Sequence, residues 1–219
     1  MQMKQTTAVV FDLDGTLLDT LEDLASSTNY ALGQFGFPLR SIDEVRSFVG
    51  NGVRKLIERS LPTAVDERTV DAVLDCFKQH YVGHCQVKTC LYPGVQQLLS
   101  VLKYKGYKLA IVSNKLQSGV DELYKRYFAD YVQVAIGERD GLRRKPAPDM
   151  VLMALDELNV CKDEAVYVGD SEVDVATADA AGMACISVLW GFRDKVFLEQ
   201  HGAQLFIREP LEMLSLLED

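Results

Sequence analysis

Two aspartates, Asp12 and Asp14, stand one residue apart at the end of the apolar run "VVFDLD", and Gly15 follows them at once. Two carboxylates held this close repel each other, so a cation or a reaction partner is expected beside them. A second acidic group, "VGDSEVD", places Asp170 and Asp174 after another apolar run. If these groups share one place, a hard divalent cation is expected among them. Mg²⁺ suits such a set, because it prefers oxygen ligands and shares its remaining positions with water and a substrate phosphate.

Three further polar residues follow other apolar runs and could act together with these carboxylates. Lys145 precedes a proline in "RRKPAPD", so its backbone is expected to be extended, and its ammonium group would balance the carboxylates and hold a phosphate. Ser113 and Asn114 end the run "LAIVSN" and could hydrogen-bond a phosphate oxygen or cap the following helix. Plainer alternatives stay open: a solvated loop lysine, a helix cap, and aspartates that only form turns.

These groups need elements that bring them together, and the chain alternates short β-rich runs with amphipathic stretches. Strands are predicted at 7–14, 107–114, 131–137, 165–170, 184–190 and, more weakly, 204–207. Helices are predicted at 93–106, 116–128 and 147–160, with a closing helix at 208–219. The strands are almost continuously apolar, as expected when helices cover both faces of a sheet. The fold class is therefore α/β, with a doubly wound parallel, Rossmann-like sheet, and ligands bind beyond the carboxyl ends of its strands.

The interval between the first two predicted strands is far longer than an ordinary connection. It reads as helices at 20–36, 42–50, 52–61 and 67–84, with no convincing strand. A connection between a strand and a helix is usually about 2–6 residues long. We therefore predict a helical subdomain at 17–84, inserted into a core domain that consists of 1–16 and 85–219.

The composition restricts the compartment and the partners. The net charge of the 219 residues is −9 with a pI near 4.9, which disfavours nonspecific binding to nucleic acid or to an anionic membrane surface. The apolar runs are strand-sized and the N-terminus resembles no signal peptide, so a cytoplasmic location is expected. A monomer and a homodimer both remain open.

One group of possible metal ligands lies apart from these motifs. The stretch "HYVGHCQVKTC" holds His80 and His84 at helical spacing, together with Cys85 and Cys90. Such residues can bind zinc, but no second ligand pair follows at a typical spacing, so a helix end with incidental polar residues is the plainer interpretation. The five cysteines are scattered and include no C-x-x-C, so no disulfide framework is expected.

Four motifs, "DLDGT", "SNK", "KPAPD" and "GDSEVD", stand in this order at the expected strand ends. Together they resemble the four signature motifs of the haloacid dehalogenase (HAD) superfamily of phosphohydrolases, and the insertion resembles the α-helical cap of that family. The resemblance implies that Asp12 is the nucleophile and forms an aspartyl-phosphate. It implies that Asp14 is the general acid for the leaving oxygen and then the general base for water.

The same resemblance assigns the remaining residues. It implies that Mg²⁺ is bound by the Asp12 carboxylate, the Asp14 carbonyl and Asp170. Lys145 and Ser113 would stabilise the phosphoryl oxygens. The supporting residues it implies are Asn114 and Gly15 in the phosphate pocket, and Asp174, which would orient Lys145 or a metal-bound water.

The segment "VGNGVRKLIERSL", together with "DLDGTLLDT" and "SNK", resembles the phosphoglycolate phosphatase branch of the family. This implies a small carboxylated phosphomonoester, 2-phosphoglycolate, with Arg54 or nearby backbone as the carboxylate binder, although a plain helix–turn–helix also explains the segment. An inorganic pyrophosphatase, a nucleotide or sugar phosphatase and a β-phosphoglucomutase-like enzyme remain alternatives, as does a non-catalytic phosphoryl sensor. A C–P hydrolase would need a lysine from the cap, for which Lys55 is the only obvious candidate.

Overall fold

The computed structural model describes residues 6–218 and divides the chain into two compact units. The larger unit runs up to Leu18 and resumes at Leu91, and the smaller unit is Asp19–Cys90. The sequence predicts the insertion at 17–84, so the smaller unit begins and ends later than expected. Residues 1–5 and 219, which belong to the predicted core domain and closing helix, lie outside the described residues.

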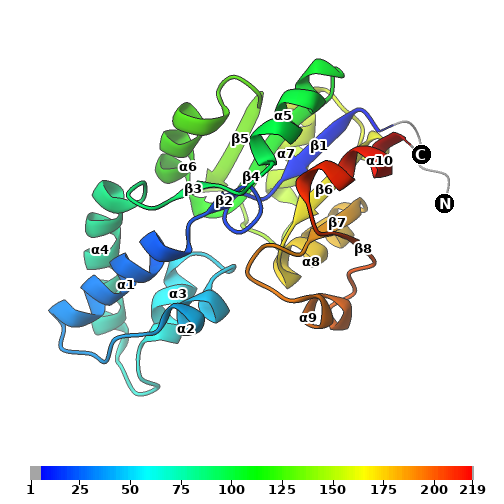
Figure 1. Ribbon diagram of the computed structural model, residues 1–219. Helices are drawn as coiled ribbons and strands as arrows, with labels where there is room; N and C mark the ends of the chain where they lie inside the picture. Colours follow the sequence, from blue (N-terminus) through cyan, green and yellow to red (C-terminus); the bar gives the residue numbers. More distant parts are fainter. Residues whose placement is uncertain (1–5, 219) are drawn as a thin grey trace. The chain divides into compact units, whose positions relative to one another are not determined.

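The larger unit is built on a six-stranded sheet in the order β5-β4-β1-β6-β7-β8 (Figure 1). Its strands are β1 Ala8–Phe11, β4 Lys108–Leu116, β5 Val134–Glu138, β6 Ala165–Gly169, β7 Ala184–Val188 and β8 Leu205–Ile207. Neighbouring strands are parallel, and Val10 of β1 pairs with Ala110 of β4 on one side and with Tyr167 of β6 on the other. The predicted α/β fold with a parallel sheet is confirmed.

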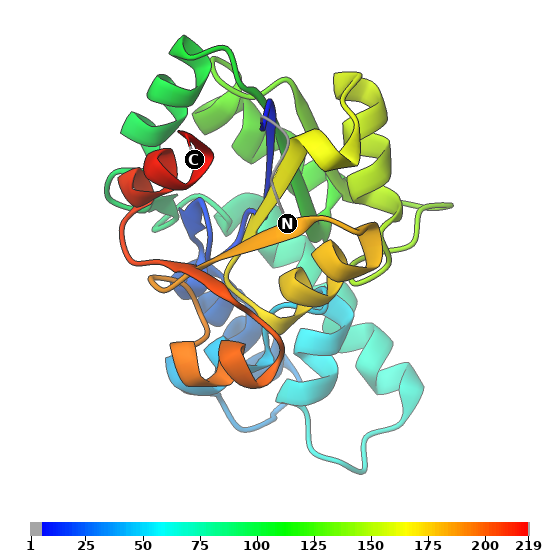
Figure 2. The same ribbon diagram turned by 90° about the vertical axis from the view of Figure 1, so that its right-hand side faces the viewer.

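Both faces of this sheet are buried by helices, because alternate residues of each strand point to opposite faces. Along β1, Val9 and Phe11 pack into one core cluster and Ala8 and Val10 into another. The first cluster includes residues of α5, α6 and α10, and the second includes residues of α7 and α8. Figure 2 shows helices on both sides of the sheet. The helices of this unit are α5 Val95–Tyr104, α6 Gln117–Leu123, the π-helical turn η1 Tyr124–Phe128, α7 Asp149–Leu158, α8 Glu172–Ala181, α9 Lys195–Gln200 and α10 Met213–Glu218, with 3₁₀ turns η2 Lys162–Glu164 and η3 Pro210–Glu212.

The smaller unit is helical, as the sequence predicts. Its helices are α1 Leu21–Gln34, α2 Ile42–Phe48, α3 Val53–Ser60 and α4 Glu67–His84, and α1 packs against α4. A capping box starts α2, in which the Ser41 hydroxyl accepts from the Glu44 N–H and the Glu44 carboxylate accepts from the Ser41 N–H. Two short strands, β2 Leu18–Asp19 and β3 Cys90–Leu91, pair with each other where the unit begins and ends.

The buried carboxylate of Asp23 connects the end of the helical unit to its first helix. It accepts hydrogen bonds from the backbone N–H groups of Lys88 (3.0 Å) and Thr89 (2.9 Å), and from the Thr89 hydroxyl (2.8 Å). Only 3% of Asp23 is exposed, so these donors replace the water that the carboxylate loses on burial. The segment before β3 is therefore held against α1.

The histidines of the possible zinc group have other partners in the structure. The His80 and His84 rings stack with their centroids 3.9 Å apart. His80 Nδ1 hydrogen-bonds the Ser27 hydroxyl at 3.0 Å, and His84 Nδ1 bonds the backbone carbonyl of His80 at 2.8 Å. Within residues 6–218 these side chains form no group of three or more metal ligands, so the zinc interpretation is not supported and the helix-end interpretation accounts for them.

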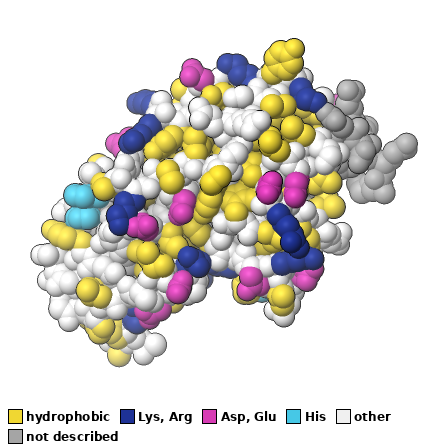
Figure 3. All heavy atoms as spheres, in the orientation of Figure 1, with side chains coloured by type: hydrophobic (Ala, Val, Ile, Leu, Met, Phe, Trp, Pro, Cys, Tyr) yellow, Lys and Arg dark blue, Asp and Glu magenta, His cyan; other side chains and the backbone are white. Residues whose placement is uncertain are grey.

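No helix among residues 6–218 combines the length and the apolar character needed to cross a bilayer. On the face drawn in Figure 3, lysine and arginine side chains alternate with acidic ones and form no broad basic patch.

Candidate active site

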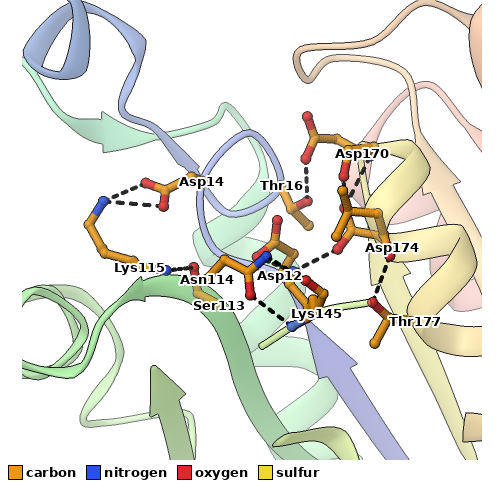
Figure 4. A network of polar contacts seen from close by, with 12 residues as sticks. Asp12, Asp14, Thr16, Ser113, Asn114, Lys115, Lys145, Asp170, Asp174 and Thr177 are labelled. Carbon is orange, nitrogen blue, oxygen red and sulfur yellow. Dashed lines mark hydrogen bonds and ion pairs between the residues drawn. The ribbon is translucent and has the colours of Figure 1, made fainter. Parts of the chain in front are cut away.

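The loop after β1 carries the two aspartates of the first motif. The Asp12 N–H still donates to the Val168 carbonyl of β6 at 2.8 Å, so the start of the loop continues the register of the sheet. The chain then turns tightly, because the Leu18 N–H donates to the Leu13 carbonyl (3.0 Å) and the Gly15 N–H donates to the Leu18 carbonyl (2.9 Å). This turn separates the side chains of the two aspartates, which have different partners (Figure 4).

Lys145 lies between two of the predicted carboxylates. Its Nζ is 2.8 Å from Asp12 Oδ1 and 2.7 Å from Asp174 Oδ1, and all three side chains are at least nine-tenths buried. Burial alone would lower the pKa of Lys145, but the two carboxylates outweigh burial and raise the pKa above its ordinary value. Lys145 is therefore charged, and the structure brings it to the carboxylates as the sequence predicts.

The pKa of the Asp12 carboxyl lies near neutral pH. Burial raises the pKa of its carboxyl to about 7, the negative charge of Asp174 adds to the rise, and the ammonium of Lys145 opposes it. A carboxyl whose pKa is shifted this far, at the carboxyl end of a central strand, is typical of an active site.

Asp170 stands beside the same loop. It accepts from the Thr16 hydroxyl (3.3 Å) and from the Phe192 N–H (2.7 Å). Burial, followed by the charges of Asp174 and Asp12, raises the pKa of Asp170 well above its usual range. Gly15, with φ at +88°, passes so close that a Cβ there would lie 2.4 Å from Asp170 Oδ2, so only glycine fits this position.

The acidic group fits a divalent cation. Oxygens of Asp12, Asp170 and Asp174 lie within 4.8 Å of one another, and they are the hard ligands that Mg²⁺ prefers. The oxygens of Asp174 already have partners: Oδ1 contacts Lys145 and the Tyr167 hydroxyl, and Oδ2 accepts from the N–H and hydroxyl of Ser171. Each Asp174 oxygen has two such partners, whereas each Asp170 oxygen accepts one hydrogen bond and Asp12 Oδ1 contacts Lys145. Asp12 and Asp170 therefore have more capacity for a cation, and Asp174 contacts Lys145.

The second motif lies inside a strand rather than after it. The sequence predicts that the strand ends at Asn114, but β4 continues to Leu116, and its pairing with β5 shifts register between Val112 and Leu116. In this irregular stretch Asn114 accepts from the Lys145 N–H (2.9 Å) and donates to the Lys145 carbonyl (3.1 Å). The Ser113 hydroxyl accepts from the Lys115 N–H at 3.2 Å. Asn114 thus holds the backbone of Lys145, a contact that the sequence does not reveal.

Two residues at the site were not singled out from the sequence. Lys115 Nζ donates to both oxygens of Asp14, at 2.8 and 3.2 Å, and its side chain is 3% exposed. The Tyr167 hydroxyl is 3.0 Å from both Lys145 Nζ and Asp174 Oδ1. Both residues stand in stretches that the sequence analysis considers: Lys115 is the last residue of "SNK", and Tyr167 carries the hydroxyl in the buried run "AVYVG". The sequence does not indicate in which direction their side chains point.

Arg54 lies in the other compact unit, on α3. Its guanidinium pairs with Glu58 (3.5 Å), Glu67 (3.5 Å) and Asp71, and about a third of its side chain is exposed. These carboxylates already compensate its charge, so a substrate carboxylate would compete with them. Its role as a carboxylate binder stays a prediction. Lys55 of the same helix pairs with Glu58 and is half exposed, so it is not the buried lysine that a Schiff base needs.

Known proteins with similar sequences include several phosphoglycolate phosphatases. The sequence model of the family "Haloacid dehalogenase-like hydrolase" matches residues 9–188. The phosphoglycolate phosphatase of Aquifex aeolicus is 32% identical over 216 residues, which cover 96% of each chain. The plasmid-encoded phosphoglycolate phosphatase of Cupriavidus necator is 36% identical over 189 residues, covering 85% of this chain and 82% of the relative. A crystal structure from Lactobacillus delbrueckii has a TM-score of 0.93 at 37% identity, covering 98% of this chain and 99% of that one.

Proposed function

The chain belongs to the haloacid dehalogenase-like hydrolase family and is a phosphatase, and from this premise we propose that it hydrolyses 2-phosphoglycolate, or a similarly small phosphorylated metabolite, through an aspartyl-phosphate on Asp12 with Mg²⁺ as cofactor. The observation that carries the proposal is the buried Asp12 carboxylate, held by Lys145 at 2.8 Å, at the carboxyl end of the central strand.

The proposed reaction has two displacements at phosphorus. An Asp12 oxygen attacks phosphorus, the bond from phosphorus to the leaving oxygen breaks, and the Asp14 carboxyl donates its proton to that oxygen. Water then attacks the aspartyl-phosphate, the bond between phosphorus and the Asp12 oxygen breaks, and Asp14 takes the proton from water as inorganic phosphate forms. The Lys145 ammonium favours the ionised form of Asp12 that attacks, and it neutralises charge on the phosphoryl oxygens.

The carboxylates of Asp12 and Asp170 and the carbonyl of Asp14 would hold Mg²⁺. The bound ion would supply positive charge against the phosphoryl oxygens and the carboxylates. The chain itself supplies the arrangement, since Thr16 and the Phe192 N–H orient Asp170 and the bonds to Ser171 orient Asp174.

The substrate part of the proposal rests on the relatives, several of which are phosphoglycolate phosphatases. The charge of −9 supports a small-molecule substrate over nucleic acid or an anionic membrane surface. A cytoplasmic site of action is part of the proposal. Arg54 is the proposed carboxylate ligand from the helical unit, and the proposal covers a monomer and a homodimer equally. An aspartate at position 14 supports turnover over phosphoryl sensing, because a sensor needs no acid for the leaving group.

The test is phosphate release from a substrate panel, with Mg²⁺ and with a chelator. The panel holds 2-phosphoglycolate, pyrophosphate, a nucleoside monophosphate, a glucose phosphate and an aryl phosphate. The expected result is metal-dependent release with kcat/KM for 2-phosphoglycolate at least about tenfold above the others. A preference for pyrophosphate, the nucleotide or the sugar would replace the proposed substrate. Isomerisation of the sugar phosphate without phosphate release would indicate a mutase.

A second arm tests the nucleophile. Asp12→Asn should abolish release while Asp163→Asn, at an exposed position on η2, should leave it unchanged. Substantial turnover by Asp12→Asn would refute the aspartyl-phosphate, and binding of phosphorylated compounds by the wild type without any turnover would favour a sensor.

A further inference from the structure

Lys115 is an enclosed lysine outside the group around Asp12. It leaves β4 from the irregular stretch and donates from Nζ to Asp14 Oδ1 at 2.8 Å and Oδ2 at 3.2 Å (Figure 4). Its side chain is 3% exposed. The stem lies along Gly119 of α6, where an added Cβ would be 3.4 Å from Lys115 Cγ and Cδ. The ammonium therefore has one well-defined position, beside the residue that serves as acid and base in the proposed function.

Stability does not account for this pair. Removing a lysine and a carboxylate from water costs free energy that their attraction offsets only partly, so a buried ion pair is weak evidence for a stabilising role. The pair also opposes the proposed chemistry, because both oxygens of Asp14 are bonded to Lys115 and one of them must reach the leaving oxygen. A substrate that drew the ammonium away from Asp14 would remove this obstacle.

The leaving group of 2-phosphoglycolate carries such an anion. Only two bonds separate its carboxylate carbon from the leaving oxygen. When Asp14 is beside that oxygen, an ammonium that reaches Asp14 can also reach the carboxylate. Among the described residues the ammonium of Lys145 is also enclosed, but it is already bonded to Asp12, Asp174 and Tyr167, and in the proposed function it serves the phosphoryl oxygens.

We propose that Lys115 is a specificity-determining residue that binds a carboxylate on the carbon next to the leaving oxygen. The substrate carboxylate takes the Lys115 ammonium in exchange for Asp14, and the Asp14 carboxyl then serves the leaving oxygen. The preferred substrates are phosphomonoesters of 2-hydroxy acids. Lys115, from the core unit, binds their carboxylate in addition to the Arg54 of the proposed function. This inference rests on the proposed function.

The test compares two substrates that differ only in the carboxylate, 2-phosphoglycolate and ethyl phosphate, in the presence of Mg²⁺. For Lys115→Met we expect kcat/KM for 2-phosphoglycolate to fall about 10- to 100-fold, the range of a hydrogen bond to a charged group. We expect kcat/KM for ethyl phosphate to rise rather than fall, because the variant frees Asp14 for a substrate that has no carboxylate to draw the ammonium away. Lys115→Arg should recover part of the loss, because it restores the charge. Lys125→Met, at an exposed lysine of η1, is the matched control and should change neither value.

Two outcomes would overturn the inference and leave the proposed function standing. Equal losses on both substrates would show that Lys115 acts only through Asp14, and unchanged kinetics on both would show that it binds no carboxylate. Circular dichroism and the unfolding midpoint check that each variant is folded. Should Lys115→Met fold poorly, Lys115→Gln, which keeps hydrogen-bond donors without the charge, gives the same comparison. The proposed function itself is tested by the wild-type protein: it would be wrong if wild type released no phosphate from 2-phosphoglycolate.

Discussion

Replacing Asp12 by Asn should stabilise the metal-free protein at alkaline pH while abolishing its activity. Burial raises the pKa of the Asp12 carboxyl to about 7, the charge of Asp174 adds to the rise, and Lys145 opposes it. An acid with a raised pKa in the folded state holds its proton more tightly there than in the unfolded chain. This contribution to stability is fully present below the unfolded pKa of 3.8 and is lost as the pH rises through about 7.

The size of the effect follows from the two pKa values. A rise from 3.8 to about 7 is roughly three pH units at about 1.4 kcal/mol each, so ionising Asp12 should lower the free energy of unfolding by about 4 kcal/mol. Asparagine has nearly the shape of the protonated acid and carries no charge, so the variant avoids this loss. The attraction of Lys145 is already included in the raised pKa. Asp170, whose pKa burial also raises, contributes in the same direction in both proteins.

The assay is urea unfolding of wild type and Asp12→Asn after removal of metal, between pH 5 and 8.5. Wild type has already lost part of this stability at pH 5. The difference in free energy of unfolding between Asp12→Asn and wild type should therefore grow by about 3 kcal/mol from pH 5 to pH 8.5. Asp163→Asn, at an exposed position, should follow wild type within about 0.5 kcal/mol at every pH. Added Mg²⁺ at pH 8.5 should stabilise wild type more than Asp12→Asn, because a ligand of the folded state shifts the equilibrium by mass action.

Two results would refute this reasoning. If the free energies of unfolding of wild type and Asp12→Asn changed in parallel with pH, burial would not destabilise the ionised form of Asp12. A variant less stable than wild type at pH 8.5 would show that the pair with Lys145 outweighs the burial and the repulsion from Asp174.

Further predictions concern single contacts. Tyr167→Phe removes a hydroxyl that bonds a buried carboxylate but leaves that carboxylate its lysine, so urea unfolding should show a loss of about 1–2 kcal/mol, against less than about 0.5 for the exposed Tyr104→Phe. Asp23→Ala leaves buried N–H donors unpaired and should cost about 3 kcal/mol by the same assay; a loss below about 1 would contradict the role given to this carboxylate. Ser41→Ala breaks a capping box, and we expect a loss of about 1 kcal/mol. Gly15→Ala places a Cβ against Asp170 at positive φ, so phosphate release should fall at least about tenfold, and full activity would show that the loop tolerates a side chain.

Much of the site could be predicted because its residues follow apolar runs. Parallel strands buried on both faces are continuously apolar, and their carboxyl ends share one rim. The sequence therefore predicts that Asp12 after β1 and Asp170 after β6 lie on one rim. The structure adds that the two strands are neighbours, which brings the carboxylates close together. The insertion could be predicted from its length and helical periodicity, with its ends displaced because short strands at its two boundaries carry little periodic signal.

The sequence by itself determined the fold class, the order of the motifs and the residue types at the rim, since these depend on local periodicity and on residue chemistry. Tertiary structure decided which side chains face each other. Lys115 reaches Asp14 because β4 pairs with β1 and continues through an irregular stretch past the predicted end of the strand. Tyr167 reaches Asp174 because the register of β6 and the start of α8 place them on the same side. A periodic pattern specifies the face on which a residue lies, whereas an ion pair between residues far apart in the chain depends on strand register and on the space left by glycines such as Gly119.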